Sequence, residues 1–121
     1  MDGWPSLRFP LIRTERKNSL AATNEEISIG PVPAGKIWAL NWVAAEDETT
    51  AFTYLRAYIG GLGEPHFLFE EKLPVAGRLY WNDTPIYLPE GRTLIARFNT
   101  TTSGDKLALY ASGFELSQPP K

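Results

Sequence analysis

Apolar residues recur at every second position along much of the chain, which is the period of a β-strand with two different faces. In the clearest run, Leu94, Ala96 and Phe98 share one face. A polar turn over 99–105 then leads into a second extended run, 106–116. Two such runs around a loop that ends in Gly-Asp predict a pair of antiparallel strands.

Shorter runs of the same kind precede this pair and are separated by glycine and proline clusters. The predicted strands are 27–29, 36–45, 52–59, 65–69, 78–81, 86–88, 92–98 and 106–116. Segment 36–45 is apolar on both faces, with Trp38, Leu40 and Trp42 predicted on one face and Val43 on the other. Apolar residues on both faces indicate a central strand, or a strand that a partner covers.

Ten glycines and ten prolines fall between these runs, and both residue types are costly inside helices. Short strands about ten residues apart predict an all-β fold, an antiparallel β-sandwich. A jelly-roll-like arrangement is favoured, and an immunoglobulin-like sandwich is the alternative. The expected organisation is an extended N-terminal arm over 1–24, a β-sandwich domain over 25–117 and a polar tail over 118–121.

The first 24 residues differ from the rest because Pro5 and Pro10 interrupt any sustained period. Up to Lys17, four basic residues stand against two acidic ones, whereas the whole chain has a net charge of −2. One interpretation is an arm that docks on a neighbouring subunit through aromatic anchors. The other is a frayed terminus or a strand lying over its own sheet. The candidate partner-binding residues are Trp4, Leu7, Arg8, Phe9, Leu11, Ile12 and Arg13.

The composition excludes several classes of protein. Cysteine is absent, so there is no disulfide scaffold, thiolate zinc site or cysteine nucleophile. A net charge of −2 gives no basic field for nucleic acid. No apolar run approaches the ~20 residues that span a bilayer, and the first residues lack the pattern of a signal peptide. We expect no nucleic-acid or membrane partner and synthesis in a cytoplasm.

Motifs for catalysis or metal binding are weak. His66 is the only histidine and lies in a short apolar run, where a histidine is usually structural. The acidic run 46–48 lacks the glycine and the ligand spacing of a calcium loop. No Gly-x-Ser-x-Gly motif occurs. The sequence therefore predicts no catalytic residue, no metal ligand and no cofactor.

Aromatic residues offer a more serious option, carbohydrate binding. Tyr54 and Tyr58 are predicted to point the same way from one strand, with Trp81 or Tyr87 nearby. A row of exposed rings can stack on sugars, and β-sandwiches often host lectins. The alternative is that these rings cover a sheet face or fill a subunit contact.

Turn and strand motifs across residues 30–116 resemble small virion proteins of tailed bacteriophages. The motifs are Val-Pro-Ala-Gly-Lys-Ile-Trp at 32–38, Tyr-Ile-Gly at 58–60, Trp81 with Pro-Ile-Tyr-Leu-Pro-Glu-Gly at 85–91, and Ser-Gly-Asp at 103–105 before Leu-Ala-Leu at 107–109. The resemblance implies a non-enzymatic building block of the virion, such as a head decoration (cement) protein. Such a protein binds the major capsid protein between capsomers as a homo-oligomer, with a trimer favoured. A receptor-binding or carbohydrate-binding module of a phage tail is the alternative.

Overall fold

The computed structural model describes residues 8–19, 24–49, 54–60, 67–72, 75–83 and 85–117. These residues form nine β-strands and no helix, and therefore no helix that could cross a membrane. The strands are β1 (Arg8–Asn18), β2 (Glu25–Ile29), β3 (Lys36–Asp47), β4 (Tyr54–Ile59), β5 (Phe67–Lys72), β6 (Tyr80–Asn82), β7 (Ile86–Leu88), β8 (Leu94–Asn99) and β9 (Lys106–Ser117). The predicted all-β sandwich is confirmed.

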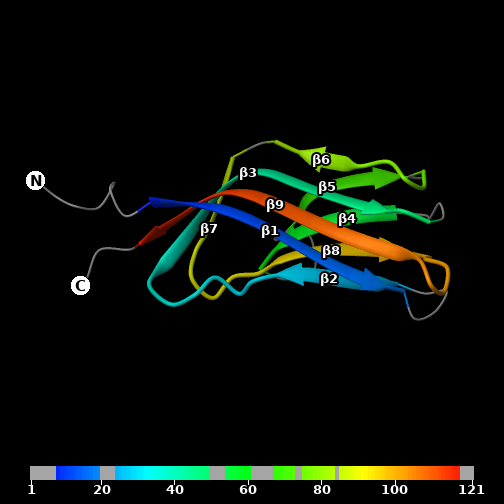
Figure 1. Ribbon diagram of the computed structural model, residues 1–121, viewed down its shortest axis with the longest axis horizontal. Coiled ribbons are helices and arrows are strands. Elements are labelled where there is room, and N and C mark those ends of the chain that lie inside the picture. The colour runs from blue at the N-terminus through cyan, green and yellow to red at the C-terminus, as the bar shows by residue number, and fades with distance from the viewer. Residues whose placement is uncertain are drawn as a thin grey trace, which may run out of the picture.

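The strands make two antiparallel sheets that pack face to face (Figure 1). Sheet A has the order β1-β9-β3-β6, and β7 also pairs with β3. Sheet B has the order β2-β8-β4-β5. The chain therefore passes repeatedly from one sheet to the other instead of completing one sheet first.

The core lies between the sheets and is built from the inward positions of each strand. Trp38 and Leu40 of β3, Leu109 of β9 and Phe98 of β8 are all at most 1% exposed. The Trp38 indole Nε1 donates a hydrogen bond to Glu115 at 2.9 Å. That bond satisfies the one polar group of this side chain, as burial requires.

The predicted pairing of 92–98 with 106–116 is wrong. The first run is β8 in sheet B and the second is β9 in sheet A, so the turn between them carries the chain across the sandwich. Within this turn Thr101 is 1% exposed, and its hydroxyl lies 2.7 Å from that of Ser19. Loops that cross between layers and hairpin loops share the same turn residues, so composition alone does not separate them.

The predicted N-terminal arm is wrong for residues 8–18, because they form β1, which pairs with β9 along its whole length. A strand over its own sheet was the other interpretation of this segment. Proline is tolerated here because β1 lies at the edge of sheet A. The inward positions include Arg13 and Lys17, which are half-buried, so the strand has no simple apolar alternation. Lys17 also ties the two sheets together through an ion pair with Glu25 of β2 at 2.8 Å.

Candidate functional site

The outer face of sheet A, which points away from the core, is the candidate site. The register of β1, β9, β3, β6 and β7 places one set of mostly apolar side chains there. We call this set the aromatic face: Pro10, Ile12, Ala39, Trp42, Ala44, Trp81, Tyr87, Ala108, Tyr110, Ser112, Phe114 and Leu116.

A β-bulge in the central strand decides which tryptophan belongs to this face. The register of β3 against β9 shifts between Leu40 and Trp42, so Asn41 is an extra residue. Trp42 therefore points outward with Ala39, whereas Val43 joins the core at 2% exposed. The predicted grouping of Trp42 with the inward Leu40 is wrong for this reason.

Large apolar side chains protrude from the aromatic face into solvent. Ile12 is 82% exposed, Tyr87 is 70% exposed and Trp81 is 59% exposed. Between them, Ala44 and Ala108 are fully buried although they point outward, because larger neighbours cover them. Apolar side chains gathered in this way on one surface mark interaction sites.

The outer face of sheet B has the opposite character. It carries two cross-strand ion pairs: Arg56 lies 2.5 Å from Glu70, and Arg97 lies 3.8 Å from Glu26. The bond to Glu70 raises the pKa of Arg56 above its usual value. Alternating apolar-in and charged-out positions are typical of a sheet that faces water. The register also places Tyr54, Tyr58 and Ile95 on this face, but within the described residues none of the large apolar side chains that are more than half exposed lies on it.

A network of charged and hydroxyl groups lies at one end of the aromatic face. The guanidinium of Arg16 is 2.8 Å from Glu48 Oε2 and donates a hydrogen bond to the Tyr110 hydroxyl at 3.2 Å. That hydroxyl in turn donates to Glu46 at 2.6 Å. Burial, and then the hydrogen bond to Glu46, raise the pKa of Tyr110 above its ordinary value of 10.0. The neutral phenol is therefore the form that this network holds.

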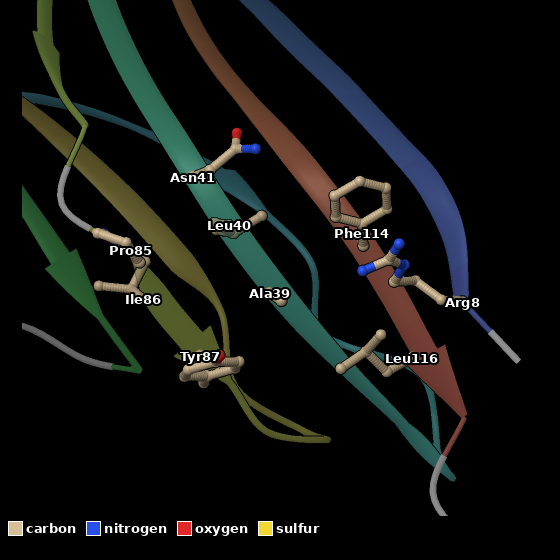
Figure 2. A pocket seen from close by; sticks show the side chains of 9 residues that line it. All are labelled: Arg8, Ala39, Leu40, Asn41, Pro85, Ile86, Tyr87, Phe114 and Leu116. Atoms are coloured by element: carbon tan, nitrogen blue, oxygen red, sulfur yellow. The ribbon is translucent and has the colours of Figure 1, made fainter. Parts of the chain in front are cut away.

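A hollow of about 260 Å³ opens at the other end of the face (Figure 2). Ala39 and Leu40 form its floor, Tyr87 stands on one side, and Phe114 with Arg8 stands on the other. The Arg8 guanidinium lies 4.5 Å from the centre of the Phe114 ring, an attractive cation–π contact. The remaining lining residues are Asn41, Pro85, Ile86 and Leu116.

The structure divides the predicted partner-binding residues into separate groups. Arg8 and Ile12 point to the outer side of sheet A, and Phe9 is 54% exposed at the end of β1. Leu11 packs against the core, and the Arg13 guanidinium lies 5.4 Å from the Trp38 ring centre. Trp4 and Leu7 lie outside the described residues, so their role stays a prediction.

The predicted sugar-stacking pair lies on sheet B, away from the aromatic face. Tyr58 is only 4% exposed, so its ring does not offer a stacking surface. Tyr54 is half-buried, and the Arg56 guanidinium lies 5.1 Å from its ring centre. Trp81 and Tyr87 belong to sheet A, so the expectation that they lie near Tyr54 is wrong.

Sequence reasoning missed Tyr110, Phe114 and the outward role of Trp42. The available signal was that 36–45 is apolar on both faces, which indicates either a central strand or a covered one. The structure shows that β3 is a central strand, because it lies inside sheet A, and that its outward side chains form part of the aromatic face.

Comparison with known proteins assigns no relative. The chain matches no protein-family model, and no curated protein is significantly similar to it. Within the described ranges, no group of three His, Asp or Glu side chains is placed to hold a metal ion. His66 lies outside those ranges, so its expected structural role stays a prediction. The aromatic face is therefore the feature on which a functional proposal can be built.

Proposed function

We propose that this chain is a non-enzymatic structural protein of a tailed-phage virion, made in the host cytoplasm and incorporated by surface contact. The specific role we favour is a head decoration (cement) protein that stabilises the capsid by binding between subunits of the major capsid protein. The observation that carries the proposal is the aromatic face, which exposes Ile12, Trp81 and Tyr87 together on one sheet.

The energetics favour coverage of the whole face rather than of one side chain. Full burial of Ile12, Trp81 and Tyr87 contributes about 1.5–3 kcal/mol each. Association itself costs roughly 4–15 kcal/mol in lost freedom, so three residues alone do not give stable binding. A partner must therefore also contact the half-buried residues of the face, such as Trp42 and Phe114.

The strand order supports a jelly roll as the finer description of the sandwich. The pairings β1-β9-β3-β6/β7 and β2-β8-β4-β5 place consecutive strands in alternate sheets up to β4. Two interlocked Greek keys produce this order in an eight-stranded jelly roll, counting β6 and β7 as one interrupted strand. Capsid and lectin domains both use this architecture, so it is compatible with either role.

Incorporation into particles tests the proposal. Purified virions of the phage that encodes the chain should contain it in heads, as detected by mass spectrometry of separated heads and tails. Trp81→Glu should abolish incorporation, because a partner cannot cover a charge at that position without cost. Ser28→Glu, at an exposed position on sheet B, is the matched control and should be incorporated normally. Absence of the protein from particles, or normal incorporation of Trp81→Glu, would refute the proposal.

A carbohydrate-binding or receptor-binding module of the tail is the second candidate. The hollow beside Tyr87 favours it, because an exposed ring next to Arg8 and Asn41 combines a stacking surface with polar groups. A glycan array should then give hits with the wild-type protein that Tyr87→Ala loses. Tyr54→Ala, on the opposite sheet, should keep those hits.

A further inference from the structure

The geometry points to a second copy of this chain as the occupant of the aromatic face. The two copies pack face to face and are related by a two-fold axis that runs parallel to the strands, between β9 and β3. This inference rests on the proposed function only for the premise that the face is a contact surface; the second copy covers the face in the free protein and must separate before the major capsid protein can cover it.

Large and small outward side chains alternate along β9 and β3 in opposite phase. The register sets Phe114 beside Ala39, Ser112 beside Trp42, and Tyr110 beside Ala44. A two-fold axis parallel to these strands and between them does not change the position of a residue along the strand direction, which we call its level. The axis therefore lays β9 of one copy over β3 of the other, with paired residues at the same level. At these three levels the large side chain of one copy then faces a small one of the other, as interdigitating sheets require. At the next level Leu116 faces Ile37, so the match of large with small ends there.

In a single copy, the hollow is the one of these small-residue positions that no neighbouring side chain of the same copy fills. Ala44 is fully buried by its own neighbours, whereas Ala39 forms the floor of the 260 Å³ hollow. A cavity of about 150 Å³ already admits a benzene ring, so a phenyl group fits. The proposed axis places the Phe114 ring of the second copy over Ala39, between Tyr87 and the Phe114 ring already there.

The area of the face is sufficient for a specific dimer. From Arg8 to Arg16 the face is about 27 Å long, and four strand widths make it about 19 Å wide. The flat footprint is about 500 Å² per copy, or about 1,000 Å² in total, which reaches the lower bound for a specific interface. Protruding side chains such as Trp81 add to this value.

The distribution of charge also fits a homotypic contact. The centre of the face carries no charged side chain, whereas Arg8 lies at one end and Arg16 with Glu46 lies at the other. A core without charges and a polar rim are typical of interfaces between subunits. Across the proposed axis, β1 lies over β7, so Pro10 of one copy faces the Tyr87 ring of the other, and the charged Arg8 stays beyond that contact at the rim.

Sedimentation equilibrium of the full chain tests for the dimer. The wild type should sediment at twice the 13.5 kDa of one chain. Tyr87→Glu should raise the dissociation constant by about a hundredfold or more, since the dimer buries this position twice. Ser28→Glu should leave the constant unchanged. Because Tyr87 is 70% exposed, the variant should melt at the wild-type temperature, which excludes misfolding as the cause.

Exchange of the two side chains that the axis brings together, Ala39 and Phe114, tests how the two copies are oriented. Ala39→Phe fills the hollow, so it should weaken the dimer by at least tenfold. Adding Phe114→Ala should restore the dimer, because the second copy then places a small side chain over the new ring. Failure of the double variant to recover would overturn the proposed axis.

Three results separate this inference from the proposed function. A wild-type monomer or trimer at all concentrations overturns the two-fold dimer, even if Trp81→Glu still fails to enter particles. A dimer that is disrupted by Tyr87→Glu but is absent from virions supports the inference and refutes the virion role. A dimer that tolerates Tyr87→Glu overturns the aromatic face as its interface.

Discussion

Gly113 is a position at which the backbone of β3 approaches β9 closely, directly opposite Leu40 and next to the bulge. A Cβ built on Gly113 would lie 2.0 Å from the Ala39 carbonyl oxygen and 2.8 Å from the Leu40 Cα. Both are backbone atoms of a central strand, so no side-chain rotation relieves the overlap. Gly113→Ala must therefore push the two strands apart.

The expected cost of Gly113→Ala is about 3 kcal/mol or more, at the upper end for overpacking. For a domain of this size, about 4 °C of melting temperature corresponds to 1 kcal/mol, so the midpoint should fall by about 12 °C or more. Gly35→Ala is the matched control: its φ is +77°, and nothing lies within 4 Å of its Cβ. In that variant only the left-handed backbone is unfavourable for alanine, which should lower the free energy of unfolding by about 1 kcal/mol and the melting temperature by about 4 °C. Thermal unfolding followed by circular dichroism measures both variants, and equal shifts would refute the close-approach argument.

Other predictions concern the core and the charged end of the aromatic face. Leu40→Ala should lower the free energy of unfolding by about 2–5 kcal/mol in a urea titration, because it leaves a cavity beside Trp38. Tyr110→Phe should cost about 1 kcal/mol at neutral pH through the lost bond to Glu46. Because folding raises the pKa of Tyr110 above 10.0, its contribution is fully present below pH 10 and is lost as the pH rises through the raised value. The fall in stability between about pH 9 and 11 should thus be smaller in Tyr110→Phe than in the wild type, and an equal fall would contradict the assignment.

Several elements could be predicted from sequence because their local signals agree with the fold. Leu94, Ala96 and Phe98 alternate as expected, and all three are fully buried in β8. The sequence did not distinguish a strand at β1 from a docking arm, because β1 lies at an edge, where Arg13 and Lys17 occupy inward positions. At an edge, long charged side chains can cover the core with their aliphatic stems and keep their charges in water.

The candidate site was harder to predict because it depends on which strands become neighbours. Trp81 and Tyr87 were expected beside Tyr54, but sheet membership is decided by crossings such as the turn between β8 and β9. The direction of Trp42 depends on a single extra residue, and alternation read along the sequence cannot register such a shift. Neither effect has a local signature in composition.

The bulge at Asn41 marks a place in the central strand where the chain length can change without a change of surface. Deletion of Asn41 would make Leu40 and Trp42 neighbours, so Trp42 would still point outward, Val43 would still point inward, and the pairing with β9 would become regular. Deletion of a residue elsewhere in β3 would instead exchange the inward and outward side chains on one side of the deletion. Single-residue insertions and deletions should therefore be tolerated at position 41 more readily than at its neighbours in this strand.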